Sequence, residues 1–348
     1  MVVKKFFGIV GKFLSFLLLT VLGVFVLLLL TINLFCNGPS NKARELFVTT
    51  FLETGQMKFV VSIFLDDKEI KEIVDNNSLQ VMDDVINPDL ITVDKTNDLK
   101  ENIEVVEIPG NSFTAKMMIV KDPSTISLAT TYPWTEYGVE LDKLVKKSNA
   151  VAGINGGLYV SASNKGGRPL GLTVSGGVIQ HLNVTGLRGV YLIGLDQNNL
   201  LRIIDLAGKN NEQVKNIIIN EKIRDAVAFQ EEASDKNNHF VKLIINGEKR
   251  VLNGLGSGAN PRTAIGQRKD GSILLLVTDG RGASGHLGAT AGDLIDIMHE
   301  YGALNAANLD GGSSSSMYYK DAYLMTSVTL YHSNSSWKLP TAFVVKEK

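Results

Sequence analysis

The sequence predicts an α+β fold, in which a domain of mixed or antiparallel β-sheet with helices follows one N-terminal transmembrane helix and a helical stalk. An uncharged apolar run near the N-terminus is long enough to span a bilayer. From about residue 103 onward, short β-rich runs alternate with Gly, Asn and Asp. One segment, residues 291–301, has helical periodicity between two such runs. Strands joined by polar turns, with few helices among them, are typical of α+β domains.

The composition narrows the class of protein. The 348 residues are enough for one large or two medium domains. A formal charge of −1 provides no bulk positive field, so nucleic acid is not expected as a partner. Cys36 is the only cysteine, so no internal disulfide forms and core burial must supply the stability. An exported domain without disulfides suits a bacterial cell envelope better than eukaryotic secretion.

The N-terminal apolar run predicts a transmembrane signal anchor at residues 13–36. Residues 13–35 carry no charge and exceed the roughly 20 apolar residues that a spanning helix needs. Lysines at positions 4, 5 and 12 precede the run, so residues 1–12 are expected in the cytoplasm and the rest of the chain outside. A cleaved signal peptide is the alternative, but its apolar region is usually about 7–15 residues with small residues at the exit. We therefore expect a single-pass cell-membrane protein that contacts the lipid bilayer through residues 13–36.

Residues 37–100 are expected to form a helical stalk and linker. Helical spacing from residue 42 predicts one helix, and the acidic start at Asp66 predicts a second helix that ends near Val74. The polar stretch that follows, up to residue 102, is typical of a linker. A helical subdomain packed on the main body is the alternative interpretation.

The β-rich region begins at about Ile103. Asp270-Gly271 lies between two apolar runs and predicts a tight hairpin. Thr290 can cap a helix from Ala291 to Tyr301, and Gly302 follows where a left-handed C-terminal cap is favoured. The expected strands are Ala115–Val120, Ile126–Thr131, Gly171–Val174, Val190–Ile193, Thr263–Gln267 and Ser272–Thr278.

Three apolar runs end in a polar residue followed at once by glycine. These ends are Asn155-Gly156-Gly157, Asp279-Gly280-Arg281 and Asp310-Gly311-Gly312. A buried strand fixes the position of such a polar side chain, and the glycines allow a sharp turn and close approach of a ligand. If the strands before Asp279 and Asp310 are parallel neighbours, their carboxylates lie on one rim of the sheet.

Asp310 and Asp279 are the candidate catalytic residues, because paired carboxylates serve as acid, base or nucleophile. Arg262 and Arg281 flank strand ends, and a guanidinium matches a phosphate bidentately. Each feature also has an ordinary interpretation, since Asp-Gly is a common turn and most arginines form surface ion pairs. The candidate substrate-binding residues are Arg262, Arg281, Asn155, Thr263, Gly311, Gly312, Ser313 and Ser314.

No metal site or cofactor is predicted. The five histidines are scattered without the spacing of zinc ligands, and no phosphate-binding loop motif is present. His286 lies in the loop after Asp279 and is expected to be an exposed loop histidine. The two carboxylates leave open whether a divalent cation binds there.

Four motifs in this order and spacing resemble the phosphodiester glycosidase family, whose bacterial members are often described as exopolysaccharide biosynthesis proteins. The motifs are Asn155-Gly156-Gly157, Pro261 to Gly266, Thr278 to Arg281 and Asn308 to Ser314. The resemblance covers roughly residues 103–345 and implies that residues 101–348 are a catalytic domain. It implies hydrolysis of a sugar from a sugar-1-phosphate diester, with an envelope or exopolysaccharide phosphoglycan as partner.

Within the matched motifs, we assign Arg262 and Arg281 to the phosphate and Asp310 to the role of nucleophile or base. Asp279 would be its partner or would orient an arginine. A phosphomonoester, with a second pKa of about 6, can leave with little protonation, so the arginines matter more than a strong general acid. We expect Asn155 to contact the sugar, and Gly312 and Ser313 to donate hydrogen bonds to phosphate oxygens.

One segment departs from the family pattern. Residues 229–238 lack a proline and carry Glu231 and Glu232, so this loop is expected to reshape the substrate pocket. Two other functions stay open at this point. One is a non-catalytic phosphoglycan-binding protein that uses the arginines alone, and the other is a hydrolase with Ser313 or Ser314 as nucleophile.

Overall fold

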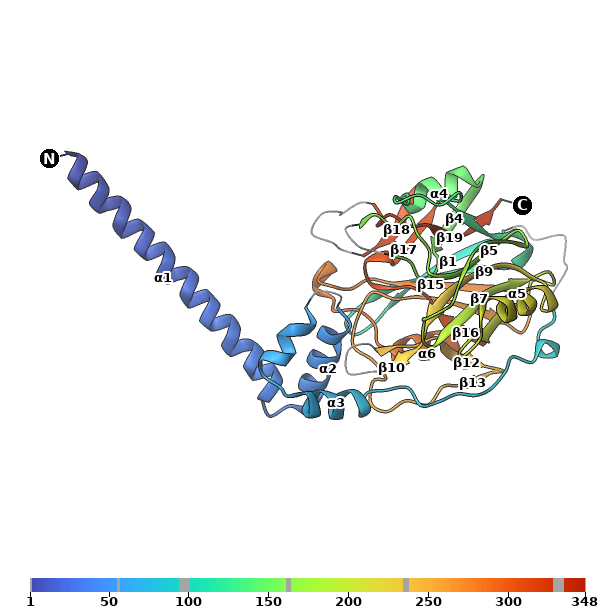
Figure 1. Cartoon of the computed structure of the whole chain (residues 1–348), viewed down its shortest axis with the longest axis horizontal. Coiled ribbons are helices and arrows are strands. Elements are labelled where there is room, and N and C mark those ends of the chain that lie inside the picture. Colours follow the sequence, from blue (N-terminus) through green and yellow to red (C-terminus); the bar gives the residue numbers. More distant parts are fainter. Residues whose placement is uncertain are drawn as a thin grey trace.

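The computed structural model describes residues 2–54, 57–93, 101–160, 164–233, 238–327 and 335–347. Helix α1 (Val2–Asn37) extends away from the rest of the protein (Figure 1). Its segment Phe6–Asn37 is long and apolar enough to cross a membrane by length and composition. At 1.5 Å per residue these 32 residues measure about 48 Å, more than the hydrocarbon core of about 30 Å. A signal sequence would share these properties.

After α1, a helical segment packs against the main body. It comprises α2 (Asn41–Leu52), the 3₁₀ turn η1 (Lys58–Ile63) and α3 (Asp67–Asp75), which enclose a small apolar core. Helix α3 starts with a capping box between Asp66 and Glu69, as its acidic start predicts. Leu79 then pairs with Leu252 of the main body. These contacts are those of a packed helical segment, the alternative to a free stalk.

In the described residues, the main body contains three antiparallel sheets and one short β-ribbon. The seven-stranded sheet has the order β1 (Ile103–Pro109), β2 (Thr114–Val120), β15 (Ile273–Thr278), β14 (Thr263–Arg268), β16 (Ala303–Asn308), β12 (Lys242–Ile245) and β13 (Glu248–Lys249). One five-stranded sheet has the order β18 (Ala322–Thr326), β17 (Ser316–Tyr319), β4 (Ala150–Asn155), β19 (Thr341–Lys346) and β3 (Ile126–Thr130). The other has the order β6 (Val178–Asn183), β5 (Gly171–Ser175), β9 (Ile223–Gln230), β7 (Val190–Asp196) and β8 (Leu201–Asp205), and the ribbon pairs β10 (Glu232–Ala233) with β11 (Asn238–His239).

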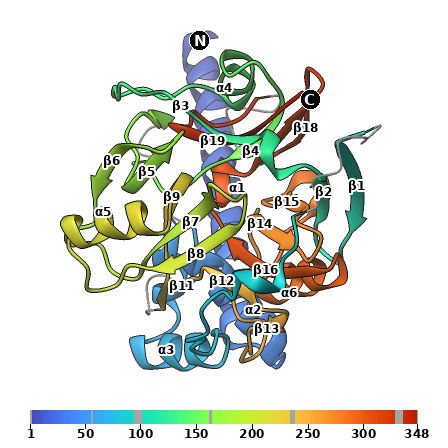
Figure 2. The same cartoon turned by 90° about the vertical axis from the view of Figure 1, so that its right-hand side faces the viewer.

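Each large sheet has one helix on its outer face. Helix α4 (Leu141–Lys147) covers the β4 sheet, α5 (Asn211–Asn220) covers the β9 sheet, and α6 (Ala291–Glu300) covers the β15 sheet (Figure 2). The helices therefore lie outside and the inner faces of the sheets meet in one central core. Further 3₁₀ turns in the described residues are η2 (Pro88–Leu90), η3 (Pro123–Thr125), η5 (Ala283–Gly285) and η6 (Gly312–Ser314).

Burial on both faces explains why the central strands have continuous apolar runs. In β15, Leu275 faces the central core and its neighbour Leu274 faces α6, since successive side chains of a strand point to opposite faces. In β2, Met118 likewise faces the central core, and Met117 faces the side of α6. The α+β fold class that the sequence predicts is confirmed.

The hairpin and the capped helix are also as predicted. Strand β14 pairs with β15 around Gly271, whose φ of +88° is favourable only for glycine. The side chain of Thr290 accepts a hydrogen bond from the backbone of Asp293 at the start of α6, and Gly302 has a φ of +80°. One expectation needs correction: β15 and β16 run in the same direction but are not neighbours, because β14 lies between them.

Candidate functional site

The candidate site forms where three strand ends meet at one edge of the seven-stranded sheet. The carboxyl ends of β15 and β16 flank the amino end of β14, since Thr278 N–H donates to Arg262 O and Leu309 N–H donates to Thr263 O. Asp279 and Asp310 therefore leave the sheet at the same edge, separated by one intervening strand. Two strand spacings correspond to about 10 Å.

The backbone of Asp310 is held by a buried amide. Asn155 Nδ2 donates to Asp310 O at 2.6 Å, and Asn155 Oδ1 accepts from Thr263 Oγ1 at 2.8 Å. Both Asn155 and Thr263 have 0% exposed surface. The expected contact of Asn155 with a sugar does not fit this geometry, because a fully buried side chain cannot reach a ligand. Asn155 and Thr263 instead join β4, β14 and the Asp310 turn.

The Asp310 carboxyl sits in a low-polarity environment. Burial raises the pKa of Asp310 to about 7, although hydrogen bonds from Ser314 and the Gly311 backbone and the charge of Arg281 oppose the shift. The residue itself remains partly accessible. A carboxyl with a pKa near neutrality can exchange a proton at physiological pH, as a general base or acid must.

Behind Asp310 lies a hydroxyl chain that the sequence did not reveal. The Tyr159 and Ser314 hydroxyls are 2.8 Å apart, and both residues are buried. When Ser314 donates its one proton to Asp310, Tyr159 must be the donor to Ser314. Burial, and then the charge of Asp310, raise the pKa of Tyr159, so this phenol keeps its proton. The only sequence signal is that Tyr159 follows Gly157 by two residues.

Arg281 reaches across the same edge toward the Asp310 turn. Its Nη1 donates to Ser313 Oγ at 2.8 Å. Gly312 lies close to this guanidinium, since a Cβ there would lie 2.7 Å from Arg281 Nη2, and its φ of +61° favours glycine. The expected hydrogen bond from Gly312 to a phosphate does not fit the structure, because Gly312 N–H already donates to Pro261 O.

Arg262 is buried and held by the segment that follows α1. Its Nη2 donates to Glu53, to Ser257 Oγ at 3.1 Å and to Gly258 O at 2.7 Å, and its guanidinium stacks on Phe240. Burial raises the pKa of Glu53, while the charge of Arg262 opposes that shift. The Nη1 group of Arg262 makes no hydrogen bond to any described residue, so it is the donor left over for a ligand.

Charge also links the two arginines. The pKa of Arg281 is lowered, first by burial of its guanidinium and then by the positive charge of Arg262, while Asp310 and Glu53 oppose the change. By surface area Arg281 as a residue is exposed, so solvent reaches its side chain even where the guanidinium touches protein. Arg281 thus lies within electrostatic range of both Arg262 and Asp310.

Asp279 is turned away from this group. Its carboxylate accepts from the Thr114 N–H of β2 at 2.7 Å and lies 2.8 Å from His286 Nδ1. Strand β2 is on the opposite side of β15 from β14, so the Asp279 carboxylate is not directed at Asp310. His286 is only 25% exposed, which corrects the expected free loop histidine. Its contact with Asp279 closes the loop that carries Arg281.

The segment 229–238, which departs from the family pattern, lies only partly within the described residues, because these omit 234–237. Glu231 forms an ion pair with Arg250 at 2.7 Å. Its negative charge is therefore neutralised within the protein. Across the described ranges, no group of three or more His, Cys, Asp or Glu side chains is arranged to hold a metal.

The fold and the site together define an α+β domain with a carboxylate–arginine centre. Residues 148–346 match the family described as phosphodiester glycosidase, which is more than half of the chain. The chain belongs to this family.

Two further proteins are similar to this chain. An uncharacterised prophage-derived protein of Bacillus subtilis, YomE, is 26% identical over 183 residues, which is 52% of this chain. The chain spans about a quarter (26%) of that relative's length. The catalytic domain of zebrafish N-acetylglucosamine-1-phosphodiester α-N-acetylglucosaminidase, in a structure described as auto-inhibited by its pro-peptide, aligns with a TM-score of 0.52 and 18% identity. That alignment covers 74% of this chain and 87% of the zebrafish chain, and it supports the fold.

Proposed function

We propose that this protein is a membrane-anchored, extracytoplasmic glycosidase that hydrolyses a sugar from a sugar-1-phosphate diester in a bacterial envelope or exopolysaccharide glycan. In this proposal α1 crosses the cell membrane once, with its N-terminus in the cytoplasm. The observation that carries the proposal is the Asp310 carboxyl, with a pKa of about 7, in electrostatic range of Arg281, which in turn interacts with Arg262.

The reaction follows from these groups. Asp310 acts in its ionised form, either taking a proton from an attacking water or attacking C1 itself. The C1–O bond breaks, its electron pair leaves on the phosphate oxygen, and water supplies OH to C1 and a proton to the solution. Arg281 and Arg262 Nη1 stabilise the charge on the departing phosphomonoester. The products are a free sugar and a phosphomonoester.

The other residues hold these groups in place. Asn155 and Thr263 fix the Asp310 turn, and Ser314 with Tyr159 supports its carboxylate. Asp279 fixes the Arg281 loop through His286, so we assign it the orienting role rather than a direct part in bond cleavage. Ser313 holds Arg281 Nη1, and Gly311 and Gly312 shape the turn.

The test is product analysis with the full chain in detergent micelles and a panel of sugar-1-phosphate methyl diesters. We expect equal amounts of free sugar and methyl phosphate. Asp310→Asn should lower turnover by about 10²–10⁴-fold, the range of a lost general base. Asp270→Asn is the matched control, since this Asp-Gly turn lies at the opposite end of the β14–β15 hairpin. Binding without turnover by the wild-type protein would favour the non-catalytic alternative.

A further inference from the structure

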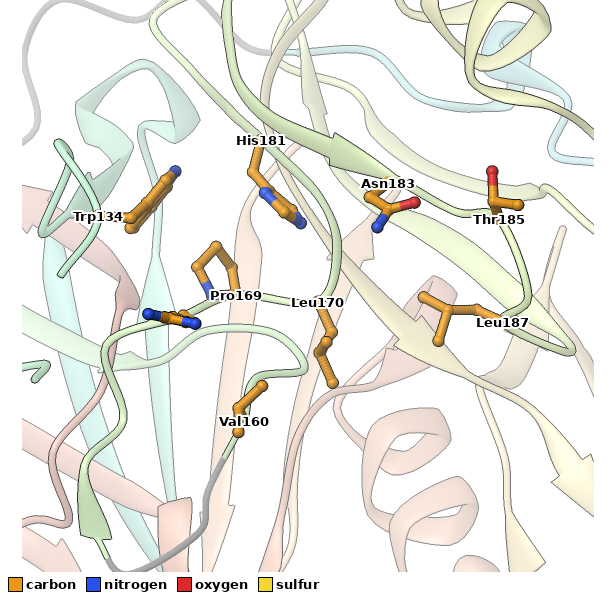
Figure 3. A pocket seen from close by; sticks show the side chains of 9 residues that line it. Trp134, Val160, Pro169, Leu170, His181, Asn183, Thr185 and Leu187 are labelled. Carbon is orange, nitrogen blue, oxygen red and sulfur yellow. The ribbon is translucent and has the colours of Figure 1, made fainter. Parts of the chain in front are cut away.

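A pocket of about 410 Å³ lies beside the extended segment that contains Tyr159, the residue that contacts Ser314. Figure 3 shows Trp134 and His181 along one side of it and Val160 and Leu170 along the other. None of its lining residues among the described parts of the chain is acidic, and Arg168 contributes a positive charge. We infer that this pocket is a second subsite, which takes an anionic sugar unit of a phosphate-linked glycan. The inference rests on the proposed function and extends it to a polymeric substrate.

The aromatic wall of the pocket is fixed before any ligand binds. Trp134 Nε1 donates to Gln180 O at 2.9 Å, so the indole has no polar group left to satisfy. The Tyr132 ring packs against Trp134 edge-on, at 5.6 Å between centroids. The face of an aromatic ring carries negative potential and attracts the C–H groups of a sugar ring. A rigid aromatic side chain also loses little conformational entropy on binding.

The polar groups of the pocket have unused hydrogen-bonding capacity. The side chains of Arg168, His181 and Asn183 make no hydrogen bond or ion pair with any described residue. Glu136, an acid that interacts electrostatically with Arg168, is already paired with Lys165. A few convergent polar groups on an otherwise apolar wall are typical of a ligand site, and an unpaired guanidinium favours a phosphate or carboxylate.

Residues 159 and 160 connect the pocket with the candidate active site. Tyr159 pairs with Pro169, and Val160 N–H donates to Arg168 O at 2.9 Å. The Tyr159 hydroxyl contacts Ser314 at the site, whereas the next residue, Val160, lines the pocket. Because successive side chains of an extended segment point to opposite faces, Ser314 and the pocket lie on opposite sides of this segment, and a glycan that occupies both must pass around its edge.

The binding test uses the full chain in detergent micelles, with Asp310→Asn so that the ligand is not consumed. The probes are a short sugar–phosphate oligomer and a neutral oligosaccharide of equal length, titrated by calorimetry. We expect Arg168→Gln to weaken binding of the phosphorylated oligomer at least tenfold and to leave the neutral one unchanged. Trp134→Leu should weaken both, while Trp134→Phe, which keeps an aromatic face, should retain them. Arg188→Gln, an exposed arginine outside the pocket, is the charge-matched control.

The turnover test separates this inference from the proposed function. With Asp310 intact, Arg168→Gln should lower kcat/KM for the oligomer about tenfold and leave the methyl diester unaffected. Unchanged binding and turnover in both Arg168→Gln and Trp134→Leu would overturn the subsite while leaving the glycosidase in place. Conversely, if the wild type cleaves neither compound but binds the oligomer through Arg168, the subsite stands and the hydrolase proposal fails.

Discussion

Glu53, at the end of α2, forms a buried ion pair with Arg262 at the amino end of β14. Glu53 also accepts hydrogen bonds from Gly258 N–H at 2.7 Å and from Asn260 Nδ2 at 2.9 Å. The side chains of both ion-pair partners are less than 10% exposed, at 3% for Glu53 and 8% for Arg262. The segment between the apolar helix and the sheets thus supplies a charge that the candidate site needs.

Removal of Glu53 should destabilise the protein strongly. Glu53→Ala leaves the Arg262 guanidinium buried without its counter-charge, which typically costs about 3–5 kcal/mol. Denaturant unfolding of the full chain in detergent micelles measures this loss. Glu72→Ala, at an exposed position of α3, should change the free energy of unfolding by less than about 0.5 kcal/mol. A Glu53→Ala variant as stable as this control would show that Arg262 does not depend on Glu53.

Removal of the helical segment that carries Glu53 should also destabilise the protein. A fragment of residues 101–348 contains every candidate catalytic residue but lacks Glu53, whereas residues 39–348 retain α2 and α3. We expect the shorter fragment to unfold at a lower temperature and to turn over sugar-1-phosphate diesters more slowly, because Arg262 loses its partner. Thermal unfolding and turnover of the two purified fragments check this. Equal values for both fragments would assign the helical segment no part in the site.

The activity should rise with pH through about 7. Asp310 acts when ionised, so below its pKa of about 7 the rate should increase tenfold per pH unit. Arg281 lowers that pKa, so Arg281→Ala should move the limb to higher pH, whereas Arg281→Lys should largely preserve it. The measurement is kcat/KM from pH 5 to 9. A limb that falls with pH would make Asp310 an acid instead.

The same pKa has a consequence for stability. The folded protein keeps the Asp310 proton up to about pH 7, while the unfolded chain releases it near its ordinary value of 3.8. The contribution of this group to the free energy of unfolding therefore decreases as pH rises between these two values. Asp310→Asn should remove that part of the pH dependence.

Tyr159→Phe should raise the pKa of Asp310, although the substitution leaves Asp310 itself unchanged. The substitution removes the hydroxyl that Ser314 contacts, and a hydrogen bond of this kind contributes about 0.5–1.5 kcal/mol. If Ser314 then turns from Asp310, the carboxylate loses a stabilising donor and its pKa rises. We expect the rise of kcat/KM with pH to move to higher pH by a fraction of a unit, with a several-fold lower rate at neutral pH. Tyr137→Phe, at an exposed tyrosine, is the control, and identical profiles for the two variants would contradict the proposed chain.

Local sequence patterns were sufficient for the fold class and several elements. Alternation of apolar runs with turn residues, the Asp270-Gly271 hairpin and the Thr290 cap depend on neighbours in the chain, and the structure has each of them. The short helices α4 and α5 were not predicted, although Leu141, Leu144 and Val145 of α4 and Val214 and Ile218 of α5 have helical spacing. The same local patterns predict Asp310 and Arg281 as site residues.

Periodicity and glycine placement are local properties, so they are enough to place polar side chains at strand ends. Which of these side chains meet depends on long-range packing. In the sheet, β14 lies between β15 and β16. The Asp279 carboxylate contacts Thr114 and His286, and the buried Asn155 side chain holds the backbone of Asp310. Contacts between distant residues, such as Glu53 with Arg262 and Tyr159 with Ser314, depend on how sheets and helices pack and leave no periodic trace in the chain.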